Sequence, residues 1–212
     1  SAMIVTNIEP DHLDHYKDLD EINNVFGNFI SLLPEGAPAV VCAEDDELVK
    51  IARKSADNVV TYGFAEDADV RITAMDPHGV TTAFALRMPD GRTVYSSIKQ
   101  NPGVHNVLNG AAVLALVDAI GLDVNKAATA LSEFTGVRRR FDLVGESCGV
   151  TVIDDYAHHP TEIAATIKAA KSLDFNKVHV VFQPHRYSRA ALFTEVLHDE
   201  FGSAFDEADT LT

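Results

Sequence analysis

The stretch from Ala39 to Tyr62, AVVCAEDDELVKIARKSADNVVTY, decides the fold class of this chain. It begins with a continuous apolar run, Ala39–Ala43, which predicts a strand buried on both faces. A short helix is expected from Asp46 to Ser55, and Val59–Tyr62 predicts the next strand. This order of strand, helix and strand indicates a parallel sheet with a helix packed against it.

The same alternation extends toward the N-terminus, where Ile4–Ile8 predicts a strand. A helix is expected over Asp20–Leu33, because its apolar residues recur at i, i+3 and i+4. Beyond residue 69 we expect an antiparallel meander of three strands, Val70–Met75, Thr81–Met88 and Thr93–Ile98. A helical pair is expected to follow, over His105–Ile120 and Asn125–Phe134. The turn sequences Asp76–Gly79 and Pro89–Gly91 predict the connections of the meander.

Strand and helix alternate again after Gly136. The expected strands are Val150–Ile153 and Val178–Phe182, and the expected helices are Pro160–Leu173 and Ala190–Phe201. We therefore predict a domain boundary at Thr135-Gly136, with one domain over residues 4–135 and another over 136–212. Ser1–Met3 is typical of a tag-cleavage scar, and the last residues, 208–212, predict the start of an interrupted strand.

The composition limits the classes of partner. The chain has 212 residues, with 32 acidic and 17 basic side chains and a formal charge of −15. Such a charge argues against nucleic acid or an anionic membrane as the main partner. We find no apolar run of roughly 18 residues and no signal peptide. A cytoplasmic location is therefore expected, with Cys42 and Cys148 as reduced thiols.

Polar clusters follow three of the predicted strands, at the ends where parallel α/β sheets bind ligands. The first, Asn7–His15, combines carboxylates with imidazoles. It suits a hard or borderline cation, with His12 as a neutral nitrogen ligand. Helix-capping carboxylates and surface histidines are the alternative interpretation.

The second cluster is Asp154–Glu162. A carboxylate at the strand tip, Asp154 or Asp155, can accept hydrogen bonds from a ribose or hold a metal, and Tyr156 can stack on a base or simply pack. His158 and His159 come at a predicted helix start, where free N–H groups favour an anion. An ordinary capped turn is the alternative.

The third cluster, Gln183–Arg189, contains His185 and two arginines in an otherwise acidic chain. Arg186 and Arg189 can each clamp a carboxylate or phosphate through two hydrogen bonds. A solvated basic loop is the alternative interpretation.

Two further groups carry polar chemistry. His105, Asn106 and Asn109 come together at the start of a predicted helix, and amide groups there can read a nucleobase edge or cap the helix. Arg138–Arg140 follows the predicted boundary, where a guanidinium between domains can clamp a phosphate and a basic linker is equally compatible. The chain contains no G-x-x-x-x-G-K-[ST] loop, G-x-G-x-x-G fingerprint or G-x-S-x-G elbow. Local chemistry thus leaves a metal-assisted hydrolase or a phosphate-handling enzyme without its phosphate loop.

Five motifs occur along the chain in an order that resembles one protein family. They are Asn7–Asp14, Gly103–Asn109, Arg139–Asp142, Asp154–Glu162 and Pro184–Arg189. The chain resembles the Mur ligases, specifically the alanine-adding member, over essentially its whole length after residue 3. The resemblance implies an α/β fold, with part of a central ATPase domain built on a mixed sheet and part of a Rossmann-like C-terminal domain. It also implies that the UDP-binding domain and the phosphate loop lie outside this chain.

The implied activity is ATP-dependent addition of L-alanine to UDP-N-acetylmuramate through an acyl phosphate, with ATP and Mg²⁺ as cofactors, in the bacterial cytoplasm. His12 resembles a magnesium ligand, and Arg140 resembles the arginine that clamps phosphate during catalysis. Nucleotide contacts are implied for His105, Asn106, Asn109, Asp155 and Tyr156. Substrate contacts are implied for His158, His159, His185, Arg186 and Arg189.

Three other hypotheses stay open. One is a murein-peptide recycling ligase of the same family, and another is a metal-dependent hydrolase that uses His12 and the Asp154–His159 cluster without ATP. The third is a non-catalytic domain that folds and binds a partner. Without its phosphate loop the chain is expected to be inactive alone, and open sheet edges are expected to permit self-association.

Overall fold

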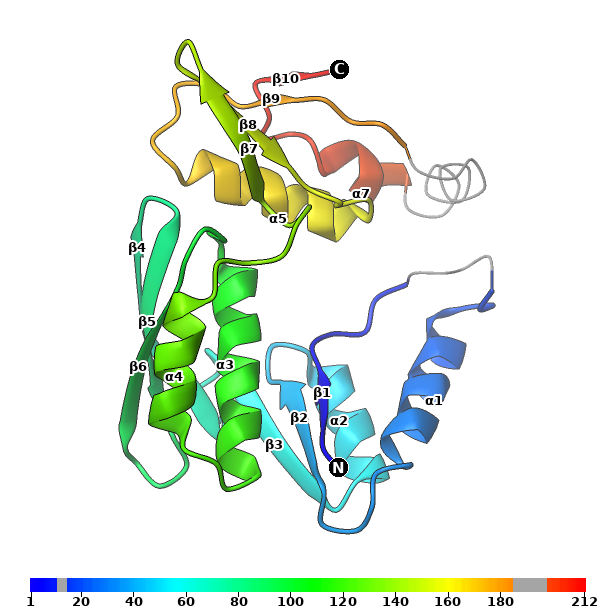
Figure 1. The fold of residues 1–212 in the computed structure, drawn as a ribbon. Coiled ribbons are helices and arrows are strands. Elements are labelled where there is room, and N and C mark those ends of the chain that lie inside the picture. Colours follow the sequence, from blue (N-terminus) through cyan, green and yellow to red (C-terminus); the bar gives the residue numbers. More distant parts are fainter. Residues whose placement is uncertain (11–14, 185–197) are drawn as a thin grey trace.

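The computed structural model describes residues 1–10, 15–184 and 198–212. A mixed six-stranded sheet in the order β1-β2-β3-β4-β5-β6 forms the larger part (Figure 1). Its strands are β1 (Met3–Val5), β2 (Pro38–Cys42), β3 (Asn58–Gly63), β4 (Val70–His78), β5 (Thr81–Arg87) and β6 (Thr93–Ile98). The first four run parallel to one another, and β5 and β6 complete an antiparallel meander. The expected mixed α/β fold is confirmed.

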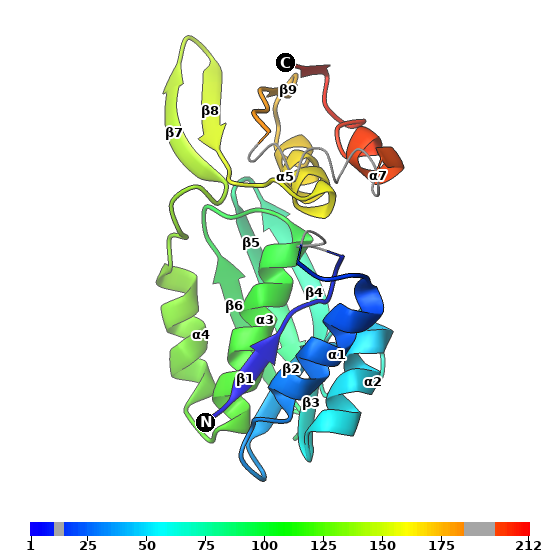
Figure 2. The same ribbon diagram turned by 90° about the vertical axis from the view of Figure 1, so that its right-hand side faces the viewer.

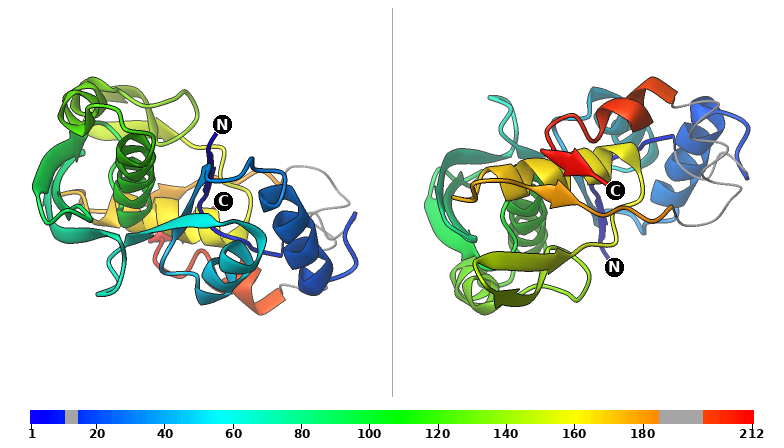
Figure 3. Two further views of the ribbon diagram at one scale, coloured as in Figure 1. Left: turned by 90° about the horizontal axis from the view of Figure 1, so that it is seen from below. Right: turned by 90° about the horizontal axis from the view of Figure 1, so that it is seen from above.

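Four helices cover this sheet on its two faces, and these are α1 (Leu19–Ile30), α2 (Asp46–Ser55), α3 (Val104–Ala119) and α4 (Val124–Glu133). The central strand β2 is buried on both sides, as its apolar run predicts. Val40 and Cys42 pack in the core beneath α3, whereas Ala39 and Val41 pack in a second core with α1 and α2. Figure 3 shows the helices on opposite sides of the sheet.

The connection between β4 and β5 differs from the expected turn at Asp76–Gly79. Strand β4 continues through Pro77 to His78, with Pro77 opposite Thr82 of β5. Its pairing with β3 is confined to Val70 and Arg71, so the other edge of β4 is open at Pro77. An open edge tolerates a residue that has no N–H to donate.

A smaller unit follows, with its elements in the order β7 (Asp142–Ser147), β8 (Val150–Asp154), α5 (Pro160–Lys171), β9 (His179–Val180), α7 (His198–Ser203) and β10 (Thr210–Leu211). β7 and β8 form an antiparallel hairpin, and β9 pairs in parallel with β10. Sequence patterning did not predict β7. The predicted helix over Ala190–Phe201 lies outside the described residues up to position 197.

The segment between α4 and β7 has an unusual backbone. Gly136, Arg139 and Phe141 all have positive φ angles, of 91°, 60° and 50°. The ring of Phe141 is buried against Ala169 and Leu173 of the smaller unit. This anchor fixes the start of the hairpin relative to α5.

The smaller unit lies beyond the carboxyl ends of the parallel strands, above the start of α3 (Figure 2). Glu9, which follows β1, contacts His159 at the start of α5. Gly103, which precedes α3, faces Ala169 of α5 so closely that an added Cβ would lie 3.3 Å from the alanine methyl. The polar ends of the sheet thus face the second unit. Among the described residues, no helix combines the length and apolar character needed to cross a membrane.

Candidate functional site

Four chain segments meet where the two units face each other, and we call this region the junction. They are the loop after β1, the start of α3, the linker residues 137–141, and the turn between β8 and α5. His159 is 7% exposed, and its Nδ1 lies 3.2 Å from Oε2 of Glu9 in the other unit. The packing of the two units therefore brings together residues that are far apart in sequence.

His105 and Asn106 lie at the start of α3. Nδ2 of Asn106 donates to the carbonyl oxygen of Pro102 at 3.2 Å and lies 2.9 Å from Nε2 of His105. Desolvation lowers the pKa of His105, the Asp155 carboxylate opposes this shift, and the Arg140 guanidinium adds to it. A neutral ring accepts from the Asn106 amide. Asn109 lies one turn further along α3 and is exposed.

Asp155 joins the linker to the turn between β8 and α5. Its Oδ2 accepts from the backbone N–H of Phe141 at 2.8 Å, and its Oδ1 accepts from that of Ala157 at 2.7 Å. The same carboxylate raises the pKa of His105 across the junction. Asp155 therefore has a structural role in addition to the ribose contact that the resemblance implies.

Tyr156 lies between two cationic or titratable neighbours. The Arg139 guanidinium is 5.3 Å from the centre of its ring, a cation–π distance, and the ring of His158 meets it edge-on at 5.2 Å. Nε of Arg139 also lies 3.7 Å from Oδ2 of Asp154. The linker thus holds one arginine on this ring.

Helix α5 begins with a capping box. The N-cap is His159, whose Nδ1 accepts from the backbone N–H of Thr161, and Pro160 occupies the first turn. Oε2 of Glu162 accepts from the backbone N–H groups of His158 and His159, at 3.1 and 3.4 Å. The anion expected at this helix start is therefore a carboxylate of the chain itself.

Glu162 also binds the linker. Its Oε1 lies 3.3 Å from Nη1 of Arg140, and its Oε2 lies 3.5 Å from Nδ1 of His158. Burial raises the pKa of Glu162, but the two backbone N–H groups and the charges of His158 and Arg140 outweigh it and lower the pKa overall. Glu162 was not among the predicted site residues. Its spacing from His159 matches a capping box, which is the signal that identifies it.

Four of the predicted site residues, His12, His185, Arg186 and Arg189, lie outside the described residues. Within residues 1–10, 15–184 and 198–212, no group of three His, Cys, Asp or Glu side chains is arranged to hold a metal ion. The described residues of the Asp154–His159 cluster thus include no such group of three.

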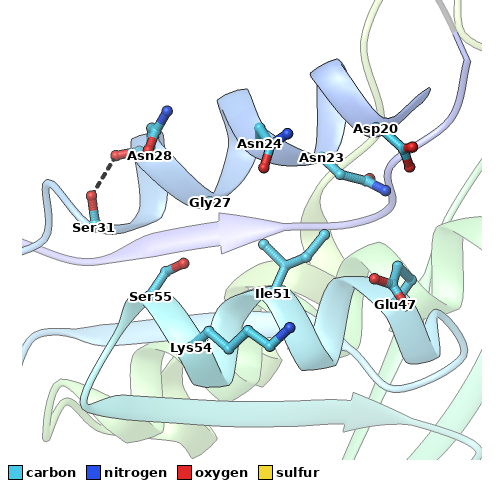
Figure 4. Close-up of a pocket in the computed structure, with 10 residues that line it drawn as sticks. All are labelled: Asp20, Asn23, Asn24, Gly27, Asn28, Ser31, Glu47, Ile51, Lys54 and Ser55. Atoms are coloured by element: carbon cyan, nitrogen blue, oxygen red, sulfur yellow. Dashed lines mark hydrogen bonds between the residues drawn. The ribbon is translucent and has the colours of Figure 1, made fainter. Parts of the chain in front are cut away.

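A hollow of about 580 Å³ lies on the surface between α1 and α2. Figure 4 shows its polar lining, with Asn23, Asn24 and Asn28 on α1 opposite Glu47 and Lys54 on α2. None of the sequence motifs contributes a residue to this hollow, and none of its lining residues belongs to the junction.

A mixed sheet that directs its strand ends at a second unit, with amide, imidazole and guanidinium groups between them, is typical of α/β proteins that bind a nucleotide between domains. Residues 1–117 match the family model for the Mur ligase middle domain, and residues 139–212 match that for the Mur ligase glutamate ligase domain. The chain belongs to the Mur ligase family.

Individual relatives agree with this assignment. A UDP-N-acetylmuramate–L-alanine ligase of Thermobifida fusca is 42% identical over 97% of this chain, and the match spans 45% of that relative. Thus the chain spans less than half the length of this curated relative.

Two solved structures share the fold. The UDP-N-acetylmuramate-alanine ligase MurC of Thermotoga maritima has a TM-score of 0.75 at 31% identity, covering 98% of this chain and 44% of that one. The MurF ligase of Thermotoga maritima, solved in complex with ADP, has a TM-score of 0.81 at 21% identity, covering 98% of this chain and 47% of that one. The MurF likeness concerns the fold alone.

Proposed function

We propose that this chain forms the nucleotide-facing parts of the central and C-terminal domains of a ligase that joins L-alanine to UDP-N-acetylmuramate in peptidoglycan synthesis. The observation that carries the proposal is the convergence of His105, Asp155 and Arg140 at the junction. Oδ2 of Asp155 accepts from the backbone N–H of Phe141, next to Arg140, at 2.8 Å, and the charges of Asp155 and Arg140 both act on the His105 ring. These residues come from three separate segments, and the family resemblance assigns them to the adenine, the ribose and the phosphates.

The proposed reaction has two steps. A carboxylate oxygen of UDP-N-acetylmuramate attacks the γ-phosphorus of ATP, and the bond to ADP breaks to leave an acyl phosphate. The neutral amine of L-alanine then attacks the acyl carbon, inorganic phosphate leaves with the bonding pair, and the amine loses a proton as the amide forms. Arg140 is proposed to hold phosphate oxygens during the first step, because a guanidinium offers several N–H donors in one plane.

The other contacts are assigned from the family resemblance. We assign His105, Asn106 and Asn109 to the adenine, and Asp155 and Tyr156 to the ribose and base. His158 and His159, together with His185, Arg186 and Arg189, are assigned to the muramoyl and alanine side. His12 is assigned to Mg²⁺, which supplies charge neutralisation at the phosphates when bound. The domain division remains 4–135 and 136–212, and the bacterial cytoplasm is the proposed location.

This chain is expected to have no ligase activity by itself. Its sequence contains no G-x-x-x-x-G-K-[ST] loop, so the β- and γ-phosphates of ATP lack the backbone cradle that such a loop supplies. Purified chain and the full-length ligase are incubated with ATP, Mg²⁺, L-alanine and UDP-N-acetylmuramate, and the products are measured by mass spectrometry.

We expect UDP-N-acetylmuramoyl-L-alanine with the full-length protein and none with the chain. Product from the chain alone would disprove its inactivity. A full-length protein that accepts only a preformed peptide would support the recycling ligase, and turnover without ATP would support the hydrolase.

A further inference from the structure

We propose that Glu162 is a positioning residue, which holds the Arg140 guanidinium against the start of α5 so that it can meet a nucleotide phosphate. The inference rests on the proposed function, because it concerns how the phosphate-binding arginine is placed. Glu162 ends the cluster Asp154–Glu162, but neither the cluster nor the resemblance gave it a role.

The two carboxylate oxygens of Glu162 have different partners. Oε2 accepts from the backbone N–H groups of His158 and His159, whereas Oε1 faces Nη1 of Arg140 at 3.3 Å. The carboxylate can therefore cap α5 and bind the linker at the same time. Because the backbone contacts fix the carboxylate, its second oxygen is a fixed acceptor for Arg140.

The guanidinium of Arg140 lies near groups of both units. Glu162 of α5 contacts the guanidinium, and the positive charge of Arg140 lowers the pKa of His105 on α3. Its backbone N–H donates to the carbonyl oxygen of Val137 at 3.3 Å, which fixes the backbone of the linker as well. The side chain of Arg140 is 51% exposed, so a contact at one nitrogen leaves the group open to an incoming anion.

An exposed arginine that has no fixed acceptor loses much rotamer freedom when it binds a ligand. A carboxylate that already restrains the guanidinium reduces this loss. Glu162 is thus expected to favour phosphate binding through Arg140 without touching the nucleotide.

The first measurement concerns the ligand-free chain. The ¹⁵N relaxation of the Arg140 Nε–Hε group is compared in wild type and in Glu162→Gln, with Arg138 as the internal reference. We expect Arg140 to be more ordered than Arg138 in wild type and to match it in Glu162→Gln. Equal mobility of the two arginines in wild type would overturn the inference.

The second measurement compares the binding of ADP with that of adenosine by titration calorimetry. Glu162→Gln is expected to weaken ADP binding about five-fold, to leave adenosine binding unchanged, and to have no effect in an Arg140→Ala background. Glu47→Gln is the matched control, because Glu47 is also a first-turn helix carboxylate paired with a cation, Lys50, at 3.1 Å. It should bind both ligands like wild type.

The outcomes separate the two proposals. If Glu162→Gln weakens the binding of ADP and of adenosine equally, the positioning role is wrong. The same holds if Glu162→Gln weakens ADP binding as much in the Arg140→Ala background as in wild type. If wild-type chain binds neither ligand, the proposed nucleotide site is wrong, and the relaxation measurement still decides whether Glu162 restrains Arg140.

Discussion

The pKa of His105 is sensitive to the junction, because two groups of opposite charge, Asp155 and Arg140, act on its ring from across the junction. Desolvation lowers its pKa, the Asp155 carboxylate raises it, and the Arg140 guanidinium lowers it. Its Nε2 lies 2.9 Å from the amide nitrogen of Asn106, which suits an unprotonated ring nitrogen. The charge state of this imidazole thus depends first on its desolvation and then on the two charged groups across the junction.

We predict that His105 titrates below its usual pKa of 6.5 in the folded chain. Arg140→Ala should move the midpoint upward, because it removes a positive charge that disfavours the protonated ring. The midpoint is read from the ring C–H signals by NMR. Arg138→Ala is the control, and an unchanged midpoint in Arg140→Ala would show that the arginine is not near the ring.

Glu162 should make the stability of the chain sensitive to acid. Its pKa is lowered below the usual 4.5, so its contribution is fully present above that pH and is lost as the pH falls through the lower, folded value. Near pH 7, Glu162→Gln should lower the free energy of unfolding by about 1 kcal/mol. Urea unfolding at a series of pH values measures this difference, which should shrink below pH 4.5. A difference that stays constant into acid would contradict the prediction.

At the scale of elements, the linker between α4 and β7 has a restricted backbone. Gly136 has a φ of 91°, and a Cβ added there would collide with the side-chain amide of Asn101, which is 7% exposed. The loop before α3 and the linker therefore pack together at a position that requires glycine.

Gly136→Ala is predicted to lower the free energy of unfolding by about 2 kcal/mol, from the positive φ and the collision together. Gly79→Ala is the matched control, since Gly79 has a φ of 57° but no atom within 4 Å of an added Cβ. It should cost about 1 kcal/mol or less. Chemical denaturation measures both, and equal costs would show that the contact with Asn101 contributes nothing.

The elements differ in how well local sequence predicts them. Helix α2, with N-cap Asp45, and strand β6 begin and end at the predicted residues, because caps or turn sequences bound them on both sides. The hairpin strand β7 was missed, because its residues, 142–147, show no regular alternation and most are exposed. β7 exists through pairing with β8, and pairing partners cannot be read from a short segment alone.

At the scale of the whole molecule, β1 is an edge strand, since within the described residues it pairs with β2 only. An open edge permits pairing with a second copy of the chain. The charge of −15 opposes such association at low ionic strength, where repulsion is poorly screened.

Self-association should therefore increase with salt. Sedimentation velocity at two protein concentrations is compared in about 0.02 M and about 0.5 M sodium chloride, where the screening length differs several-fold. We expect the average mass to rise with protein concentration, and more so at the higher salt. A constant monomer mass under all four conditions would rule out association through the edge.

The site was predicted in part from sequence. The family resemblance assigns His105 and Asp155 to one nucleotide, and the structure brings the Asp155 carboxylate within electrostatic reach of the His105 ring. The pairing of Arg140 with Glu162 could not be predicted, because it depends on three positive φ angles in the linker that no local pattern specifies. The contact of Arg139 with Tyr156 has the same origin.

We propose above that the junction binds a nucleotide. The most direct test is an ADP titration of ¹⁵N-labelled chain, followed residue by residue through its amide signals. We expect shifts at His105, Asn106, Arg140 and Asp155 that saturate together and weaken in Arg140→Ala but not in Arg138→Ala. Shifts confined to the hollow between α1 and α2, or no shifts at all, would contradict it.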